Sequence, residues 1–182
     1  PADFIYDRSF GKEAKQTADY VKTVVEAMQS QNIGSTLKHF PGYGNNKDSH
    51  TAVTYDKRSL TEFQTSDFLP FKAGIEEGVP TILVCHNIVE SIEKDVPASL
   101  SSKVHKILKE QLGFSGLILT DDLAMEAVAQ YASLEEVAIL AVEAGNDIIL
   151  SSDFVTQRDA IVKAVENHRI AEDTIDNAVK KI

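Results

Sequence analysis

Residues 113–122 are Gly113-Phe114-Ser115-Gly116-Leu117-Ile118-Leu119-Thr120-Asp121-Asp122, in which a short, mainly apolar run lies between glycines and two carboxylates. A run of this length bounded by turn residues is typical of a buried strand. The other stretches with this pattern are 35–40, 81–85 and 146–150. The sequence therefore predicts four buried strands.

The segments between these runs favour helices. In residues 13–31 the apolar side chains recur at steps of three and four, which is one face of a helix: Ala14, Ala18, Val21, Val25 and Met28. Ser101 or Ser102 can cap a helix that Gly113 closes. Other helices are expected at 62–78, 125–131, 133–144, 155–167 and 172–182, whereas 42–60 and 86–100 are expected to be loops.

Short apolar strands that alternate with helices indicate an α/β protein with a parallel sheet covered by helices. An open doubly wound sheet and a (β/α)8 TIM-type barrel share this alternation, and the number of units separates them. Four units are visible, whereas a barrel of about 250 residues needs eight. If the fold is a barrel, residues 1–182 are a single partial domain, roughly its second half, with the early strands missing.

The composition narrows the class of function. The 182 residues carry a net charge of -10, with 28 acidic and 18 basic side chains, and no basic run occurs. Nucleic acid is therefore not an expected partner, because its phosphates require clustered Lys and Arg. The sequence contains no apolar stretch of about 18 residues and does not begin with a charged leader, so no membrane segment is expected.

Polar residues cluster where the predicted strands end. In both α/β architectures the site lies at the carboxyl ends of parallel strands. The residues at those ends are Lys38-His39, His86-Asn87, Asp121-Asp122 and Ser151-Ser152-Asp153. These side chains are the candidates for a functional site.

Each candidate also has a structural interpretation. Asp121 and Asp122 can cap the following helix, an interpretation that we keep for Asp122. Lys38 and His39 can form a structural ion pair, and strand alternation sends only one of them inward unless a bulge or twist places the other. His86 has the same ambiguity as this pair.

Asp48 and His50 lie two residues apart in the polar loop, so an extended chain presents both on one side. Asp48 can orient the imidazole of His50, which suits general acid/base chemistry because an ordinary histidine titrates at about 6.5. Most such loop residues are simply solvated, and by itself the pair is weak evidence. His105 and His168 are expected at the surface.

The sequence lacks the motifs that are typical of several other kinds of active site. No His-x-x-x-His or Cys-x-x-Cys spacing occurs, and the glycines at 42 and 44 lack the third glycine and the helix of a phosphate loop, so we expect no metal and no cofactor. No Gly-x-Ser-x-Gly nucleophile elbow is present, which argues against an unrelated serine hydrolase. The single cysteine, Cys85, is expected to be a buried small apolar residue.

Five motifs in this order resemble glycoside hydrolase family 3, in particular its β-N-acetylhexosaminidase branch, over nearly the whole chain. They are Asp7-Arg8-Ser9-Phe10-Gly11, Lys38-His39-Phe40-Pro41-Gly42, Asp48-Ser49-His50, Pro97-Ala98-Ser99-Leu100-Ser101 and the segment from Gly113 through Asp121-Asp122-Leu123 to Met125. The resemblance implies a (β/α)8-type catalytic barrel and a terminal β-linked N-acetylglucosaminide as substrate, such as a peptidoglycan fragment.

The resemblance also implies roles for particular residues. Asp121 matches the nucleophile of the family, and Asp48 with His50 matches an acid/base dyad on a mobile loop. The residues that match those binding the sugar hydroxyls are Arg8, Lys38 and His39. A retaining mechanism would then form a glycosyl-enzyme on Asp121, which water activated by His50 releases.

The sequence departs from the family in two places. Residues 42–46 are Gly42-Tyr43-Gly44-Asn45-Asn46, where the family usually has a histidine and then Asp-Thr, which affects the sugar preference. The early strands and a sugar-binding acid of the family are also missing. Because a half barrel exposes strand edges, we expect a missing N-terminal half or a homodimer to cover them. The alternative is a non-catalytic sugar-binding or structural remnant that is inactive alone.

Overall fold

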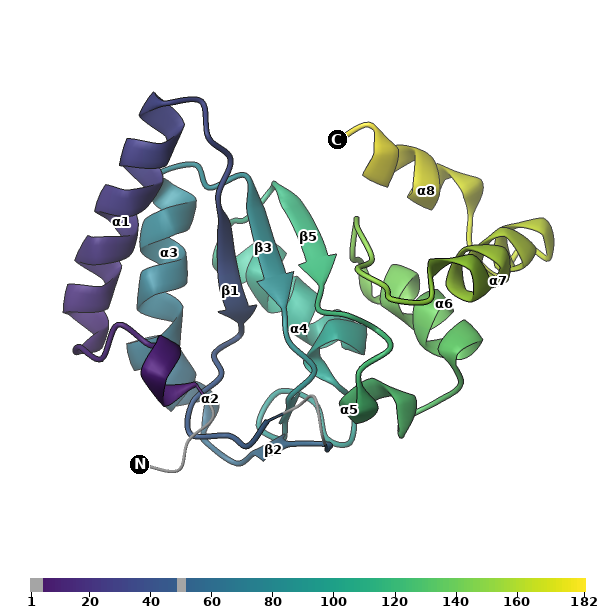
Figure 1. The fold of residues 1–182 in the computed structure, drawn as a ribbon, viewed down its shortest axis with the longest axis horizontal. Helices are drawn as coiled ribbons and strands as arrows, with labels where there is room; N and C mark the ends of the chain where they lie inside the picture. The colour runs from purple at the N-terminus through teal and green to yellow at the C-terminus, as the bar shows by residue number, and fades with distance from the viewer. Residues whose placement is uncertain (1–4, 49–51) are drawn as a thin grey trace.

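The computed structural model describes residues 5–48 and 52–182. Its main sheet contains three parallel strands in the order β1 (Thr36–Phe40), β3 (Thr81–Val84) and β5 (Leu117–Thr120). Figure 1 shows the three arrows side by side and pointing the same way. The α/β class and three of the four predicted strands are thus confirmed.

The fourth predicted strand is not formed as a strand. Residues 146–150 contribute one parallel bridge, between Leu119 and Ile148. Side-chain oxygens take donors that a longer ladder would use, because Asp147 accepts the Ile118 N–H at 3.0 Å and Thr120 Oγ1 accepts the Leu150 N–H at 3.1 Å. The segment therefore lies beside β5 without extending the sheet.

Helices cover the sheet as the spacing predicts. α1 (Ala14–Ser30) and α3 (Phe68–Glu76) lie together on the β1 side, and α6 (Leu134–Ala144), α7 (Phe154–Glu166) and α8 (Glu172–Val179) lie beyond β5 (Figure 1). α5 (Glu126–Ala129) is short. Gly145 ends α6 in a left-handed conformation with φ +106°, as expected for a C-terminal glycine.

Two of the predicted helices are divided. The first consists of α2 (Leu60–Glu62), a π-helical turn at Phe63–Asp67, and α3. The second begins at α4 (Ser102–Lys106), whose N-cap is Ser101, and continues as a π-helical turn at Ile107–Gln111. Ser101 Oγ accepts the Val104 N–H at 3.1 Å, which confirms one of the two expected caps.

The two segments that the sequence predicts as loops each contain a short strand, and these two strands pair with each other. β2 (Tyr55–Asp56) and β4 (Ile88–Val89) form a second, two-stranded parallel sheet. Short helical turns occur at Tyr6–Arg8 and Ala98–Leu100. The β2 and β4 pairing joins the segment after β1 to the segment after β3, below the strand ends in Figure 1.

The main core lies between the sheet and the helices α1, α3 and α4. The ring centroid of Phe40 is 5.6 Å from that of Phe68 and 5.1 Å from that of Phe71, and all three rings are buried. Cys85 is fully buried as expected, and burial raises the pKa of its thiol to about 12. A second apolar cluster surrounds α6.

His105 is buried, which corrects the expectation that it lies at the surface. Its Nδ1 is 2.8 Å from the Ser101 carbonyl oxygen and therefore donates to it, and burial lowers the pKa of the ring. His105 faces the Gly145 turn at the end of α6, a neighbour that helical spacing alone cannot show. His168 is exposed, as predicted.

Candidate active site

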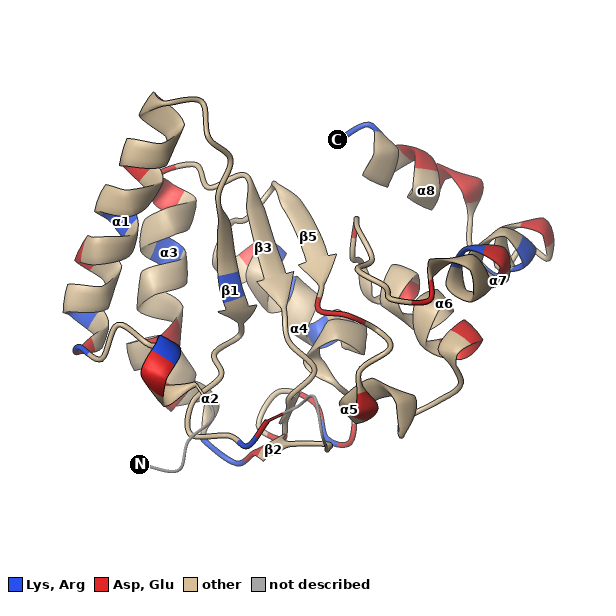
Figure 2. Ribbon diagram, in the orientation of Figure 1, with Lys and Arg blue, Asp and Glu red and all other residues tan. Residues whose placement is uncertain are grey.

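The candidate residues meet because the strands are parallel. His39 lies within β1, whereas His86 and Asp121 follow the ends of β3 and β5. Figure 2 shows a basic position on β1 and an acidic stretch directly after β5, at the same end of the sheet. This is the edge where open sheets and barrels place their sites.

An irregularity in β1 sets the direction of Lys38 and His39. Leu37 pairs with Ile82 and Phe40 with Val84, so three steps along β1 oppose two along β3. The additional residue is the mark of a bulge, and the Lys38–His39 and Phe40–Pro41 peptide bonds are cis. Lys38 is exposed, whereas the His39 side chain is only 9% exposed. Only one of the pair, His39, is turned inward, as strand alternation predicts, and the structure has a bulge rather than a simple twist at this point.

Asp121 is held by the backbone around it. Its N–H donates to the Val84 carbonyl oxygen at 3.1 Å, and its Oδ1 accepts the Asp122 N–H at 3.0 Å. The other carboxylate oxygen, Oδ2, lies 4.0 Å from His39 Nε2. With 23% of the side chain exposed, the carboxylate is oriented yet accessible to a ligand.

Asp122 does not cap the following helix, contrary to the sequence-based interpretation. α5 begins four residues later, at Glu126, with Met125 as its N-cap. Asp122 Oδ1 instead accepts the N–H groups of Ala124 and Ser152 at 2.9 and 3.1 Å, and Ser152 Oγ bonds Oδ2. Although burial favours the neutral acid, the hydrogen bonds from Ser152 and Ala124 outweigh it and lower the pKa of Asp122.

His86 is a buried link between β3 and the turn that contains Asp121. Its Nε2 is 3.0 Å from the Asp122 carbonyl oxygen, which can only accept, so Nε2 carries the hydrogen. In the neutral ring Nδ1 then accepts the hydroxyl hydrogen of Ser99 at 2.8 Å. The His86 ring is fully buried. Its geometry therefore supports a structural role next to Asp121.

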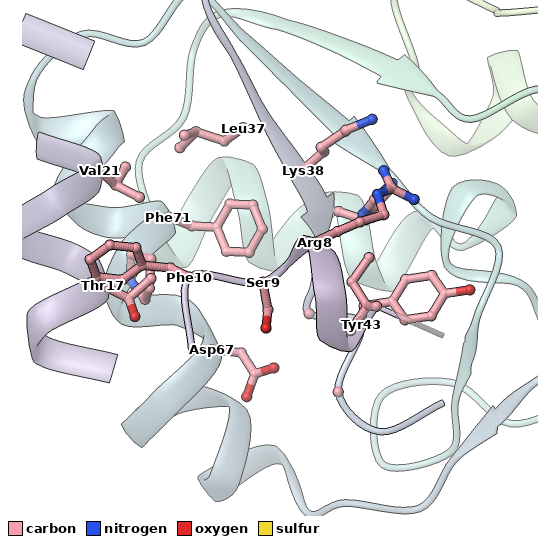
Figure 3. A pocket seen from close by; sticks show the side chains of 15 residues that line it. Arg8, Ser9, Phe10, Thr17, Val21, Leu37, Lys38, Tyr43, Asp67 and Phe71 are labelled. Carbon is pink, nitrogen blue, oxygen red and sulfur yellow. The ribbon is translucent and has the colours of Figure 1, made fainter. Parts of the chain in front are cut away.

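A cavity of about 430 Å³ gathers the three residues predicted to bind the sugar, Arg8, Lys38 and His39. This volume is within the usual range for small-molecule sites. In Figure 3, Arg8, Lys38 and Tyr43 lie on one side of β1, and the apolar Leu37 and Phe71 lie on the other. Two cationic side chains and an imidazole beside apolar walls suit a polar, hydroxyl-bearing ligand.

The acid/base pair is only half within the described residues. Asp48 is half-buried in the segment after β1, where it has electrostatic or hydrogen-bonding contacts. His50 lies outside the described residues. The Asp48–His50 pairing therefore stays a prediction.

The structure adds Tyr43 to the candidate site. The Tyr43 ring is 7% exposed, lies edge-on to His39 with centroids 5.5 Å apart, and lines the same cavity. The hydroxyl donates to the Lys47 carbonyl oxygen at 3.0 Å. Tyr43 occupies the position where the sequence departs from the family pattern, and that departure is the signal that could have identified it.

Among the described residues, 5–48 and 52–182, no group of three or more His, Cys, Asp or Glu side chains is arranged to hold a metal ion. In the same part of the chain, no helix is both long and apolar enough to cross a membrane.

Residues 1–182 match the family described as Glycosyl hydrolase family 3 N terminal domain. The chain belongs to glycosyl hydrolase family 3. A Beta-hexosaminidase from Nitrosomonas eutropha is 33% identical over 172 residues, which cover 93% of this chain and 49% of the relative. A Beta-hexosaminidase from Xanthomonas axonopodis pv. citri is 32% identical over 148 residues, which cover 80% of this chain and 44% of the relative.

Solved structures agree with this family 3 assignment. A glycoside hydrolase family 3 beta-N-acetylglucosaminidase from Paenibacillus sp. str. FPU-7 superposes with a TM-score of 0.89 at 34% identity, over 96% of this chain and 34% of that one. The beta-N-acetylglucosaminidase from Thermotoga maritima gives 0.88 at 27% identity, over 96% and 39%. The fold is thus part of a (β/α)8-type barrel, and this family 3 chain spans about half the length of the curated relatives it matches.

Proposed function

We propose that the protein containing this chain is a retaining β-N-acetylhexosaminidase that forms a covalent glycosyl-enzyme on Asp121. The observation that carries the proposal is the carboxylate of Asp121 at the end of β5. One of its oxygens is fixed by the Asp122 N–H and the other faces His39, which lines the cavity with Arg8 and Lys38. A carboxylate held in this way, 4.0 Å from a residue that lines the cavity, suits attack on an anomeric carbon.

The surrounding cations have separate tasks in this mechanism. Arg8 and Lys38 donate hydrogen bonds to the sugar hydroxyls, and charge-assisted bonds of this type fix the ring over the nucleophile. His39 lies between the sugar-binding cavity and Asp121, so it can donate to a hydroxyl next to the reacting carbon. The positive charge that the sugar acquires in its oxocarbenium-like transition state is stabilised by the negative charge of the Asp121 carboxylate.

The proton transfers are assigned to His50 together with Asp48. His50 in its protonated form donates to the leaving oxygen, and the neutral ring then removes a proton from the water that releases the sugar. Asp48 orients the ring and stabilises its cationic form. Retaining enzymes usually place a second carboxyl group about 5–5.5 Å from the nucleophile, so a histidine on a loop is a departure from that arrangement.

The proposed substrate is a terminal β-linked N-acetylglucosamine, with peptidoglycan fragments as its source. Similar proteins named Beta-hexosaminidase and beta-N-acetylglucosaminidase support the sugar class. The second candidate, a sugar-binding protein without turnover, is favoured by the position of the cavity at the edge strand β1, where the sheet has no further neighbour among the described residues.

Kinetics of an Asp121→Asn variant separate the two candidates. With 4-methylumbelliferyl N-acetyl-β-D-glucosaminide as substrate, the variant should lose at least about 10³-fold in kcat, because an amide is a poor nucleophile. Asp95→Asn is the matched control, since Asp95 is exposed at φ +60°, a conformation that asparagine tolerates. Normal hydrolysis by Asp121→Asn would contradict the proposal, and binding without hydrolysis in the unmodified protein would favour the second candidate.

A further inference from the structure

An ion network lies beside the start of the loop that carries Asp48. The Arg58 guanidinium is placed between two carboxylates, with Nη2 2.8 Å from Asp56 Oδ2 and Nη1 2.9 Å from Asp67 Oδ2. Nε donates to Asp56 Oδ1 at 3.0 Å, and the guanidinium carbon is 4.3 Å from the centroid of the Phe63 ring. No local pattern in the sequence predicts this network, because its members come together only in the fold.

The network depends on Arg58 for its charge balance. Burial opposes ionisation of Asp56, but the hydrogen bonds and charge of Arg58 outweigh it, so the pKa of Asp56 is lowered. For Asp67 burial is the larger effect, and its pKa is raised despite Arg58. The Asp56 and Asp67 side chains are only 3% and 12% exposed. Without the arginine, two buried carboxylates would face each other.

Residues 42–46 rest directly on this network. A Cβ atom added to Gly42 would lie 2.1 Å from Asp67 Oδ1, and one added to Gly44 would lie 2.6 Å from Arg58 Nη2. Asn46 Nδ2 donates to Asp56 Oδ2 at 2.9 Å and to the Tyr43 carbonyl oxygen at 2.8 Å. The chain entering the loop is therefore held by the ion network.

The chain leaving the loop is held at the same place. Asp56 belongs to β2, which pairs with β4, and the Thr54 hydroxyl donates to Asn87 Oδ1 at 2.5 Å. Arg58 follows two residues after Asp56, and its own N–H donates to Asp56 Oδ1 at 3.0 Å. One guanidinium thus connects both flanks of the segment that includes Asp48.

We infer that Arg58 is a positioning residue for proton transfer. By bridging Asp56 and Asp67, it holds both flanks of the segment that includes Asp48, and so it determines where Asp48 lies. This inference rests on the proposed function. Arg58 acts through the loop and does not contact the sugar. Its loss should therefore impair the steps that require a proton more than the attack by Asp121.

Arg58→Lys tests the inference because lysine keeps the charge but cannot bind two carboxylates with one planar group. The matched control is Arg169→Lys, since Arg169 also bridges two carboxylates, Glu136 and Glu143, but at an exposed place on the α6 side. A leaving group that is a strong acid needs little protonation. We expect kcat/KM to fall about tenfold or more for phenyl N-acetyl-β-D-glucosaminide and less than about threefold for its 2,4-dinitrophenyl analogue.

A second measurement needs no turnover. Amide hydrogen exchange of residues 42–48 should become about tenfold faster in Arg58→Lys, with exchange in α6 unchanged, because only the loop flanks lose their link. Gly44→Ala should act similarly by displacing the guanidinium. Gly113→Ala is its control, since Gly113 also has a positive φ, +74°, but open space around the added atom.

Unchanged exchange in residues 42–48 would overturn the inference. An equal loss of kcat/KM for both substrates would also overturn it, because a general structural defect does not distinguish leaving groups. If the unmodified protein hydrolyses neither substrate, the proposed function fails, and hydrogen exchange alone still decides whether Arg58 holds the loop.

Discussion

His86 is a buried residue whose hydrogen bonds hold the turn that contains Asp121, the proposed nucleophile. Its ring joins the Ser99 hydroxyl to the Asp122 carbonyl, the peptide group directly after Asp121. A polar ring that is fully buried and has partners on both nitrogens cannot be exchanged without leaving those partners unsatisfied. Stability and the orientation of the proposed nucleophile therefore depend on the same side chain.

We predict that His86→Asn lowers the free energy of unfolding by about 2–4 kcal/mol, through one or two unsatisfied buried groups and a small cavity. Urea unfolding measures the change. The same substitution at exposed His168, which has φ +60°, should change stability by less than about 0.5 kcal/mol. Equal effects at the two positions would show that the His86 hydrogen bonds contribute little.

The position of Asp121 and His39 at one edge of the sheet could be predicted from the sequence, because parallel strands bring their carboxyl ends together there. Sequence reasoning failed for Asp122, whose partner Ser152 is thirty residues away and whose helix begins later than the spacing suggested. It also failed for His105, because helical periodicity does not show which neighbouring turn faces a given side chain. Both errors arise because a local sequence pattern does not show which distant residues become neighbours in the fold.

At the level of elements, the turn after β5 is joined to the turn before α7 through Asp122. Its carboxylate is ionised at neutral pH and accepts two backbone N–H groups and a hydroxyl. This junction holds the segment that contains the proposed nucleophile against the segment 151–153. The junction should weaken in acid, because a protonated carboxyl group accepts hydrogen bonds less strongly than a carboxylate does.

The sign of this response follows from the lowered pKa of Asp122, in which the hydrogen bonds of Ser152 and Ala124 outweigh burial. The carboxylate stabilises the fold above its ordinary pKa of about 3.9, and this contribution is lost as the pH falls through the depressed folded-state value. In Asp122→Asn, the free energy of unfolding should fall less steeply between about pH 4.5 and pH 2. Urea unfolding measured across this pH range tests the prediction, with Asp95→Asn as the control. Parallel curves of unfolding free energy against pH for Asp122→Asn and the unmodified chain would contradict it.

Long single elements were predictable, but their interruptions were not. The helix at 13–31 was found nearly to its ends because its apolar period is regular and local. The π-helical turns, the β2–β4 pairing and the failure of 146–150 to extend the sheet depend on residues far along the chain. Local pattern therefore predicted the order of elements better than their pairing.

At the scale of the whole molecule, the described residues form part of a barrel whose sheet ends at β1 on one side. Apolar rings near this edge are exposed: Tyr6 by 54%, Phe10 by 46% and Tyr20 by 49%, and Phe10 stacks on Tyr20 with centroids 4.3 Å apart. An open strand edge beside exposed rings favours pairing with another chain or domain.

We therefore propose that residues 1–182 alone either self-associate or show no hydrolysis, and that further barrel strands or a second copy cover the β1 edge. Sedimentation equilibrium should give a mass above the 20.0 kDa of one chain, or the monomer should lack activity on the 4-methylumbelliferyl substrate. A stable, well-folded monomer with full activity would contradict this proposal.

The most direct test of the central claim is covalent trapping of the sugar. A 5-fluoro-N-acetylglucosaminyl fluoride should form a glycosyl-enzyme that breaks down slowly, because fluorine destabilises the oxocarbenium-like transition state. Intact mass followed by peptide mapping of the full protein should place one sugar on Asp121 and none in Asp121→Asn. Label on another residue, or continued hydrolysis with no covalent adduct, would contradict Asp121 as the nucleophile.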